Sequence, residues 1–240
     1  MLKTFLLSFD DTDNLETLGT GHLLDDFLRS LPMGCSHSFI SRHQLFVNPA
    51  VPYTSHNSSM CAVVKGELSM EELVRLGSAY LEEKSAPGSD PGLCVADMDD
   101  LPSMEELVLW GYCAKREVLS KAAAYELAEK NHVHLSEHGG TGQGVVGALA
   151  AVGLRLAGQD GRVKGKKAVF KDILTVRELL EETGFDRVCA YGTGELAGDE
   201  NIRIDGKPVK AVYQGFCSTV IATKKNGEYA LLSKDMVKCF

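Results

Sequence analysis

The chain has 240 residues, enough for one large domain or two small ones at roughly 100–200 residues per domain. Hydrophobic residues make up 44% and charged residues 24%, so the composition excludes a disordered, collagen-like or coiled-coil protein. The formal net charge of -8 argues against a broad basic surface for nucleic acid. The acid is concentrated in residues 1–120, which hold 8 Lys and Arg against 18 Asp and Glu, whereas residues 121–240 hold 17 against 15.

The seven cysteines predict neither a disulfide framework nor a zinc site, because their number is odd and no C-x-x-C pair occurs. Reduced thiols are typical of the cytosol. No apolar run reaches the roughly 18 residues of a membrane span. We therefore expect a soluble, cytoplasmic protein with no membrane contact.

The first part of the chain alternates short apolar runs with stretches of helical period. Strands are predicted over 2–9, 35–47, 59–65, 93–96 and 132–135. Helices are predicted over 21–31, over 70–81 and from 104 to Trp110, the last two after capping boxes, and over 114–130 and 145–157. An irregular loop at 48–57 and a turn-rich linker at 86–91 complete this part.

The pattern changes near residue 158. A basic, glycine-punctuated stretch at 161–167 precedes one capped helix that ends near Gly184. Short strands are predicted over 186–190, 201–204, 208–213, 216–223 and 228–232, with hairpin-type turns at Asp205-Gly206 and Asn226-Gly227. The expected fold is α+β, with a nucleotide- and metal-binding region at 1–157 and a β-rich accessory or completing region at 158–240.

Three carboxylates follow the first strand within four residues: Asp10, Asp11 and Asp13. Like charges this close repel each other, and hard oxygen ligands on a loop suit Mg²⁺ with phosphate oxygens completing its shell. The alternative is a solvated turn in which an aspartate caps the next helix.

A glycine-rich turn precedes the apolar helix at 145–157 and comprises His138, Gly139, Gly140, Thr141, Gly142 and Gly144. Glycines let backbone N–H groups approach an anion closely, and a helix N-terminus adds partial positive charge, so a phosphate is a natural ligand. A Walker A motif is excluded because no Lys-Ser or Lys-Thr follows the glycines. The alternative is a tight turn with close helix packing.

Two further groups of residues carry weaker signals. His132, His134 and His138 have spacings that could bind a transition metal, but no carboxylate or cysteine set completes a site, which favours ordinary surface or substrate-contact histidines. The loop 48–57 gathers hydrogen-bonding side chains, including His56 and Asn57, and loops of this length are often functional.

Taken together, these motifs resemble the archaeal tRNA(Ile) agmatidine synthetase family. The matching stretches are Phe9-Asp10-Asp11-Thr12-Asp13, Gly19-Thr20, Asn48-Pro49-Ala50-Val51-Pro52 running to Asn57, Asp90-Pro91-Gly92, and Val146-Gly147-Ala148-Leu149-Ala150-Ala151-Val152-Gly153. They occur in the family's order and cover residues 5–155 in patches.

The resemblance implies a kinase-like ATP-using region beside a ferredoxin-like domain. In that family a nucleobase carbonyl oxygen is phosphorylated and then displaced by an amine. In that family the early aspartates hold metal and phosphate, which would be Asp10, Asp11 and Asp13 here, and Thr20 sits at the spacing of a threonine of its kinase-like centre. The sequence departs from the family at Leu18-Gly19-Thr20-Gly21 and at Tyr53-Thr54-Ser55-His56-Asn57, and it lacks the OB and zinc-ribbon modules that bind tRNA.

We therefore expect a Mg²⁺- and ATP-dependent transferase or ligase that acts on a small metabolite. His56, Asn57 and His138 would orient the acceptor, and residues 139–144 would cradle phosphates or substrate. A nucleotide- or metabolite-binding regulatory protein and a metal-dependent hydrolase remain as alternatives. A homodimer is possible.

Overall fold

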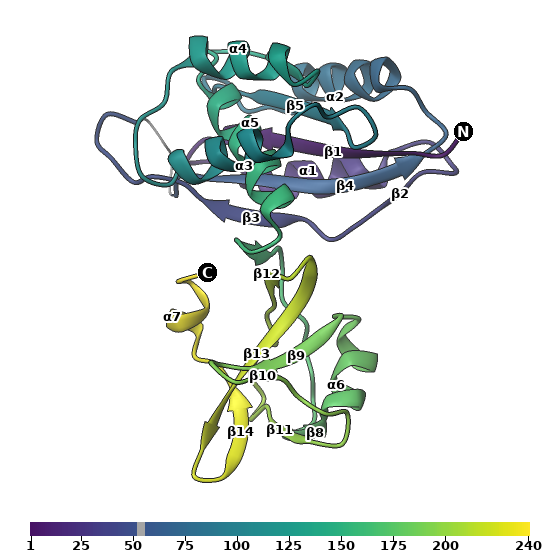
Figure 1. The fold of residues 1–240 in the computed structure, drawn as a ribbon, viewed down its shortest axis with the longest axis vertical. Coiled ribbons are helices and arrows are strands. Elements are labelled where there is room, and N and C mark those ends of the chain that lie inside the picture. The colour runs from purple at the N-terminus through teal and green to yellow at the C-terminus, as the bar shows by residue number, and fades with distance from the viewer. Residues whose placement is uncertain (52–55) are drawn as a thin grey trace. The chain divides into compact units, whose positions relative to one another are not determined.

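The computed structural model describes residues 1–51 and 56–240. The chain divides into two compact units, Met1–Ala157 (unit 1) and Gly158–Phe240 (unit 2), which are drawn in Figure 1. Each unit combines helices with β-sheet, so the predicted α+β fold is confirmed. In the described residues, no helix has the length and apolar character needed to cross a membrane.

Unit 1 alternates strands and helices along most of its length. Its elements are β1 (Lys3–Asp10), α1 (Thr20–Arg29), β2 (Ser36–His37), β3 (Ser41–Gln44), β4 (Ser58–Gly66), α2 (Met70–Lys84), β5 (Gly92–Asp97), α3 (Met104–Cys113), α4 (Lys121–Lys130), β6 (His134–Glu137) and α5 (Gly144–Ala157).

The sheet of unit 1 has a ferredoxin-like centre. Strands β5, β1, β4 and β3 lie side by side in that order and are antiparallel throughout. With α1 after β1 and α2 after β4, they follow the β-α-β-β-α-β order of ferredoxin-like folds. Strand β6 adds to the free side of β5. The register sets Asp10 opposite Gly92 and Gly92 opposite Glu137, so three segments far apart in sequence meet at one end of the sheet.

The two faces of this sheet bury different side chains, as the alternation of a strand requires. Phe5, Leu7 and Phe9 of β1 pack with residues of α1 and α2. Leu6 belongs to a second cluster, which it shares with residues of α3, α4 and α5. Helices therefore cover both faces, and β1 is buried between them (Figure 1).

Helix α5 lies deep in unit 1 because small residues let its neighbours approach. A Cβ added at Gly153 would overlap the carbonyl group of Leu107 in α3. From Val145 to Leu154 every described side chain except Val146 is buried. The apolar composition of the predicted helix is thus explained by burial on nearly all sides.

The helix predicted over 114–130 is wrong in its first part. Helix α3 runs to Cys113, residues 114–120 form a turn and a loop, and α4 begins after Ser120. The Ser120 hydroxyl accepts a hydrogen bond from the Ala123 N–H at 3.2 Å, which satisfies a first-turn donor and starts the helix there. The alanine-rich composition concealed this break.

The single strand predicted over 35–47 is also wrong. The structure has two shorter strands, β2 and β3, which both pair with β4. Between them the Val63 N–H donates to the Ser38 hydroxyl at 3.0 Å rather than to a backbone carbonyl. The side chain of Ser38 thus replaces a bond of the backbone ladder and interrupts the strand.

Unit 2 consists of short strands with one longer helix. Its elements are β7 (Arg162–Val163), β8 (Ile173–Thr175), α6 (Val176–Thr183), β9 (Arg187–Ala190), β10 (Gly194–Glu195), β11 (Asn201–Arg203), β12 (Val212–Gln214), β13 (Cys217–Lys225), β14 (Glu228–Leu231) and α7 (Lys234–Val237). Strand β13 is the centre, because it pairs with β12, β14 and β9. Helix α6 starts at the predicted capping box of Thr175 and Glu178 and ends at Gly184 with φ 70°.

The two predicted hairpin turns have different outcomes. Asn226-Gly227 joins β13 to β14, where Lys225 pairs with Glu228, as predicted. Asp205 and Gly206 also have positive φ angles, 53° and 64°, but the strand before them pairs with β8 and β14, so no hairpin forms there. A turn fixes only the local chain direction, whereas burial of Ile202 decides its partners.

Candidate functional site

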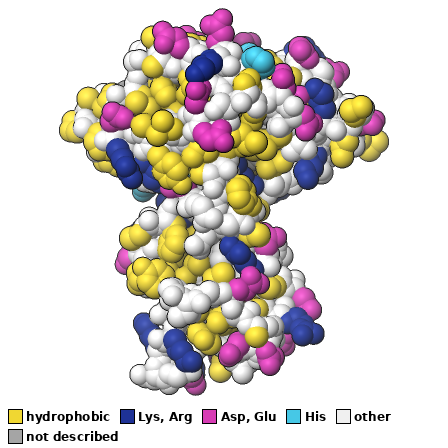
Figure 2. All heavy atoms as spheres, in the orientation of Figure 1, with side chains coloured by type: hydrophobic (Ala, Val, Ile, Leu, Met, Phe, Trp, Pro, Cys, Tyr) yellow, Lys and Arg dark blue, Asp and Glu magenta, His cyan; other side chains and the backbone are white. Residues whose placement is uncertain are grey.

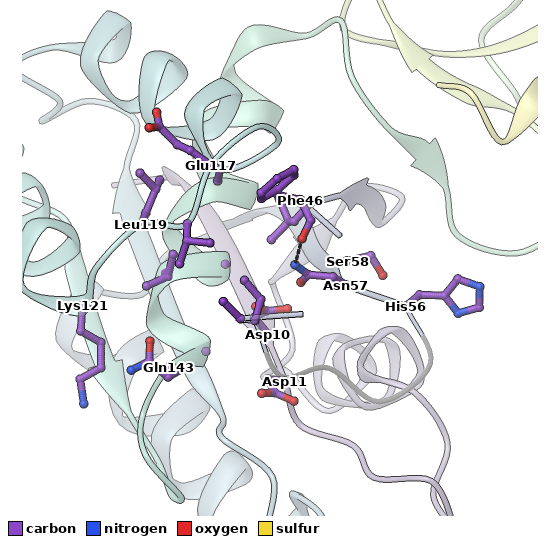
Figure 3. Close-up of a pocket in the computed structure, with 18 of the residues that line it drawn as sticks. Asp10, Asp11, Phe46, His56, Asn57, Ser58, Glu117, Leu119, Lys121 and Gln143 are labelled. Carbon is purple, nitrogen blue, oxygen red and sulfur yellow. Dashed lines mark hydrogen bonds between the residues drawn. The ribbon is translucent and has the colours of Figure 1, made fainter. Parts of the chain in front are cut away.

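A cavity of about 470 Å³ lies in unit 1 at the end of the sheet where β1 ends. Figure 3 shows many of its lining residues. Those used below are Asp10, Asp11, Asp13, Thr20, Phe46, His56, Asn57, Glu117, Lys121, Gln143, Gly144 and Gly147. They come from the turn after β1, the start of α1, the connection between β3 and β4, the segment before α4, and the start of α5.

Asp10 is the last residue of β1, and its carboxylate lies against α5. A Cβ added at Gly147 would overlap the Asp10 carboxylate, so only glycine allows this approach. The side chain borders the cavity and is half-buried. Burial first, and then the charge of Asp11, raise the pKa of Asp10 well above its ordinary value.

Asp11 projects from a strained turn. Its φ angle is 50°, in the left-handed region that non-glycine residues rarely adopt. Burial, followed by the charges of Asp90 and Asp13, raises the pKa of Asp11 to about 6. The end of β1 therefore concentrates negative charge that a cation or a hydrogen-bond donor would offset.

Asp13 and Thr20 hold this turn against α1. Asp13 Oδ1 accepts hydrogen bonds from the Thr20 hydroxyl at 2.9 Å and from the Thr20 N–H at 3.3 Å. The Thr20 hydroxyl in turn accepts from the Thr12 N–H at 3.2 Å. Asp13 thus caps the N-terminus of α1, which is the alternative role considered for an aspartate of this turn.

The aspartate turn fits Mg²⁺ only as part of a larger donor set. Among the described residues, no three His, Cys, Asp or Glu side chains converge as metal ligands. Asp10 and Asp11 remain near the cavity, and Mg²⁺ commonly binds one or two carboxylates while waters and substrate phosphates complete its octahedron. The pair is consistent with that mode of binding, in which a polyphosphate brings the missing oxygens.

The glycine-rich turn is fastened to the chain segment before β5 through Asp90. The Asp90 carboxylate accepts hydrogen bonds from the N–H of Thr141 and, at 2.6 Å, from its hydroxyl. The Gly144 N–H donates to the Asp90 carbonyl oxygen at 3.1 Å. Gly140 has φ 56°, and a Cβ there would overlap the Asp90 carboxylate. Glycine is therefore required at this position for Asp90 to reach Thr141.

Lys121 brings positive charge to the cavity from the first turn of α4. Its ammonium donates to Glu137 Oε2 at 2.7 Å and to the Thr141 carbonyl oxygen at 2.8 Å. The Tyr125 hydroxyl donates to the other Glu137 oxygen at 3.1 Å. Lys121 and Asp90 thus hold Thr141 from two sides, and Lys121 is the one Lys or Arg among the described lining residues.

The structure brings together part of the predicted site. Seven predicted residues line the cavity: Asp10, Asp11, Asp13, Thr20, His56, Asn57 and Gly144. The other five do not line it: His138, Gly139, Gly140, Thr141 and Gly142. They precede α5 and adjoin two lining residues, because the Lys121 ammonium donates to the Thr141 carbonyl oxygen and Gln143 follows Gly142 in the chain.

The two residues expected to orient an acceptor from the loop 48–57 differ in orientation. The Asn57 side chain donates to the Phe46 carbonyl oxygen at 2.6 Å, so it supports the loop backbone. His56 is exposed and points away from Asp10 and Asp11 in Figure 3. The remaining predicted loop residues at 52–55 lie outside the described residues.

His138 takes part in a hydrogen-bonded row on β6 and the residue after it. Ser136 Oγ lies 2.8 Å from His138 Nε2 and 2.9 Å from His134 Nε2. On its other side, His138 Nδ1 lies 3.7 Å from Glu82 Oε1. Burial lowers the pKa of His138, and the carboxylate of Glu82 opposes that shift. This histidine is engaged within the fold, away from the cavity lining.

Sequence reasoning missed Asp90, Glu117, Lys121 and Gln143. Asp90 had a signal, because Asp90-Pro91-Gly92 was one of the stretches that carried the family resemblance and stands directly before a buried strand. Glu117 and Lys121 had none, since the segment that contains them was assigned to a continuous helix. Only the break before α4 brings them to the cavity.

Comparison with known proteins identifies a fold. No protein-family model matches the chain, and no curated protein matches it. A solved structure of TiaS with an isoleucine tRNA and ATP is similar over 73% of this chain and 39% of that chain, with 21% identity and a TM-score of 0.56. TiaS with the same tRNA, AMPCPP and agmatine matches over 80% and 48%, with 17% identity and a TM-score of 0.55. A tRNA fluorescent labeling enzyme matches over 72% and 39%, with 22% identity and a TM-score of 0.55.

The chain thus has an α+β fold of the kind found in these tRNA-binding or tRNA-labelling enzymes. TiaS is a tRNA agmatidine synthetase, so the resemblance found in the sequence motifs is confirmed as a likeness of fold. The chain spans less than half the length of each of these structures.

Proposed function

We propose that the chain is a Mg²⁺- and ATP-dependent enzyme that transfers a phosphoryl group to, or ligates, a small metabolite. One observation carries the proposal. Asp10 ends β1 directly against the start of α5, Asp11 follows it, and both border one cavity. The fold that creates this juxtaposition is similar to that of a protein solved with ATP. A metal-bound phosphate requires carboxylates that bind the cation and, beside them, a positive group such as a helix N-terminus that attracts the anion.

Asp10 and Asp11 would hold Mg²⁺ with their carboxylates. When bound, the cation would neutralise charge on the transferred phosphoryl group, because phosphoryl transfer is catalysed mainly by positioning and electrostatic stabilisation. The protein's own contribution is to fix the carboxylates. Thr20 and Asp13 tie their turn to α1, and Gly147 leaves room for the Asp10 carboxylate beside α5.

The phosphates would lie at the start of α5, near Gly144 and the side chain of Lys121. The helix N-terminus offers a partial positive charge, while the N–H groups of Gly144, Val145 and Val146 already donate to backbone carbonyl oxygens. Lys121 adds a full positive charge that the structure places within hydrogen-bond distance of the preceding turn. Glycines at 139, 140 and 142 would set the backbone of that turn.

A small acceptor suits the dimensions of the cavity. At about 470 Å³ it falls within the roughly 300–1,000 Å³ of small-molecule sites. Its described lining combines apolar residues such as Val51, Leu119 and Val146 with the carboxylates already named. Such a surface is suited to enclosing a metabolite, and Glu117 could bind a polar or cationic group on it.

Calorimetric titration of ATP with and without Mg²⁺ tests the proposal, followed by an assay for ADP or AMP. We expect Mg²⁺-dependent binding to the wild type and a loss of at least about tenfold in affinity for Asp10→Asn and Asp11→Asn, since each removes one charge from the cation site. Asp99→Asn is the matched control. Asp99 is an exposed carboxylate beyond the end of β5, at the opposite end of the sheet.

The outcomes separate the proposal from its main alternative. Binding without turnover, across candidate amines and carbonyl compounds as acceptors, would indicate a nucleotide-binding regulatory protein. Absence of ATP binding in both media would reject the ATP-dependent function. Equal losses in Asp10→Asn and Asp99→Asn would show that general charge, and not this site, governs affinity.

A further inference from the structure

Asp90 occupies the hydrogen-bond donors of Thr141, which stands in the turn just before the proposed phosphate position at Gly144. Its two carboxylate oxygens accept from the N–H and the hydroxyl of Thr141. The turn that carries Thr141 leads directly into α5. An anion arriving at this turn therefore meets a carboxylate already bound to Thr141.

The charges around Asp90 make binding of a metal-free anion at this turn electrostatically unfavourable. Burial, and then the charge of Asp90, raise the pKa of Asp11. The hydrogen bond from Lys121 lowers the pKa of Glu137, and the charge of Asp90 opposes that shift. The nearby cation, Lys121, is shared between Glu137 and the carbonyl oxygen of Thr141. A metal-free polyphosphate would add several negative charges beside Asp10, Asp11 and Asp90, where like charges repel each other more strongly near protein than in water.

A divalent cation would reduce the repulsion between these carboxylates and a polyphosphate. The Asp90 backbone lies beside the end of β1, because Gly92 pairs with Asp10. If the Asp90 carboxylate left Thr141, it would supply, together with Asp11 and phosphate oxygens, the hard ligands that Mg²⁺ prefers. The same movement would free the Thr141 donors for phosphate. Cation binding and phosphate binding would then require the same displacement of Asp90.

We propose that Asp90 is a positioning residue that makes the site accept metal-complexed polyphosphates and reject metal-free ones. This inference rests on the proposed function and extends it, because it defines the form of nucleotide that binds. The carboxylate blocks Thr141 in the conformation described and becomes a partner of the cation when a metal–polyphosphate complex enters.

Binding calorimetry distinguishes this role from a purely structural one. ATP and inorganic pyrophosphate are titrated into the full chain, in EDTA and in Mg²⁺, for the wild type, Asp90→Ala, Asp90→Asn and the control Asp99→Asn. In EDTA we expect Asp90→Ala to bind both ligands about tenfold more tightly than the wild type, which corresponds to about 1.4 kcal/mol. The ratio of affinities with and without Mg²⁺ should fall by more than tenfold.

Asp90→Asn guards against a folding defect, because an amide oxygen can still accept from the Thr141 N–H while the charge is lost. We expect it to shift the metal dependence in the same direction. Fluorescence of Trp110, which is the one tryptophan of the chain, checks that unit 1 is folded in each variant.

Two results would overturn the inference. If folded Asp90→Ala and Asp90→Asn bind more weakly by the same factor in EDTA and in Mg²⁺, Asp90 only supports the turn. If their metal dependence equals that of the wild type, Asp90 has no part in it. A wild type that binds neither ligand in either medium would instead reject the proposed function itself.

Discussion

Unit 1 and unit 2 both carry many charged side chains. They differ in net charge and in the burial of the elements that carry the carboxylates. Unit 1 has 11 Lys and Arg against 21 Asp and Glu, and unit 2 has 14 against 12. On the face drawn in Figure 2, acidic side chains are spread over the surface of unit 1. The carboxylates proposed as cation ligands are different, because Asp10 stands at the end of a strand whose centre is buried on both faces.

In unit 2 many charged side chains are exposed. Asp235, for example, has an 89% exposed side chain and pairs with Lys238 three residues later. Asp10 and Asp11 instead approach α5 and Asp90 across the sheet. The comparison shows that acidic residues acquire raised pKa values, and with them a tendency to bind protons or cations, where long buried elements hold them together.

The largest effect is expected for Leu149→Ala in the core of unit 1. Leu149 is fully buried in α5, and a Leu→Ala change at such a site lowers the free energy of unfolding by about 2–5 kcal/mol. Trp110 fluorescence follows unit 1, because this side chain is 8% exposed and its indole N–H donates to Val146 in α5. Leu15→Ala, at an 84% exposed position, is the control.

Far-UV circular dichroism in the same experiment reports both units. We expect a second transition, from unit 2, that Leu149→Ala leaves in place. A single transition that moves as a whole would show that the two units unfold as one, and would remove the basis for comparing them.

A smaller loss is expected for Gly153→Ala. The added Cβ would overlap the Leu107 carbonyl group, which belongs to the backbone of α3, and overpacking of this kind costs about 1–3 kcal/mol. In unit 2, Gly198→Ala meets only the flexible side chain of Arg177 at 3.7 Å. Denaturant unfolding of both variants should therefore place the cost in unit 1, and an equal change in the two would contradict the packing described.

The free energy of unfolding of unit 1 should depend on pH because of Asp11. Its pKa is raised from 3.8 to about 6, so the folded chain binds this proton more tightly than the unfolded chain does. The free energy of unfolding of the metal-free protein should therefore fall as pH rises from about 4 to about 6. Asp11→Asn should flatten that decline, as measured by urea unfolding with Trp110 fluorescence at each pH. An unchanged slope in the variant would assign the decline to another group.

The smallest effect is expected for Asp235→Asn in unit 2. The Lys238 ammonium donates to Asp235 at 3.0 Å and lowers the pKa of that carboxyl. Its contribution has the opposite sign to that of Asp11, since it is present above pH 3.8 and is lost as pH falls. Because both side chains are exposed, unfolding of unit 2 followed by circular dichroism should shift least of all four variants. A shift as large as that of Leu149→Ala would contradict the exposed character of the pair.

The sequence predicted the elements whose signals are local. The helix at α2 follows from the capping box of Ser69 and Glu72, whose two hydrogen bonds are both present. The buried strand β1 follows from its apolar run, and the Asn226-Gly227 hairpin from two residues that tolerate positive φ. The break before α4 was missed because the side chain of one residue, Ser120, sets the start of that helix.

The candidate site also has a part that the sequence predicted and a part that only the tertiary structure decided. Residue types and their order predicted the aspartate turn at Asp10, Asp11 and Asp13, and the glycine turn before α5. The strand register decided that they meet, since Asp10 lies opposite Gly92, and Gly92 opposite Glu137. The tertiary structure alone decided that Asp13 caps α1, that Lys121 reaches the cavity, and that Asp90 occupies Thr141. These contacts join residues far apart in sequence or depend on side-chain direction, and neither is determined by local propensity.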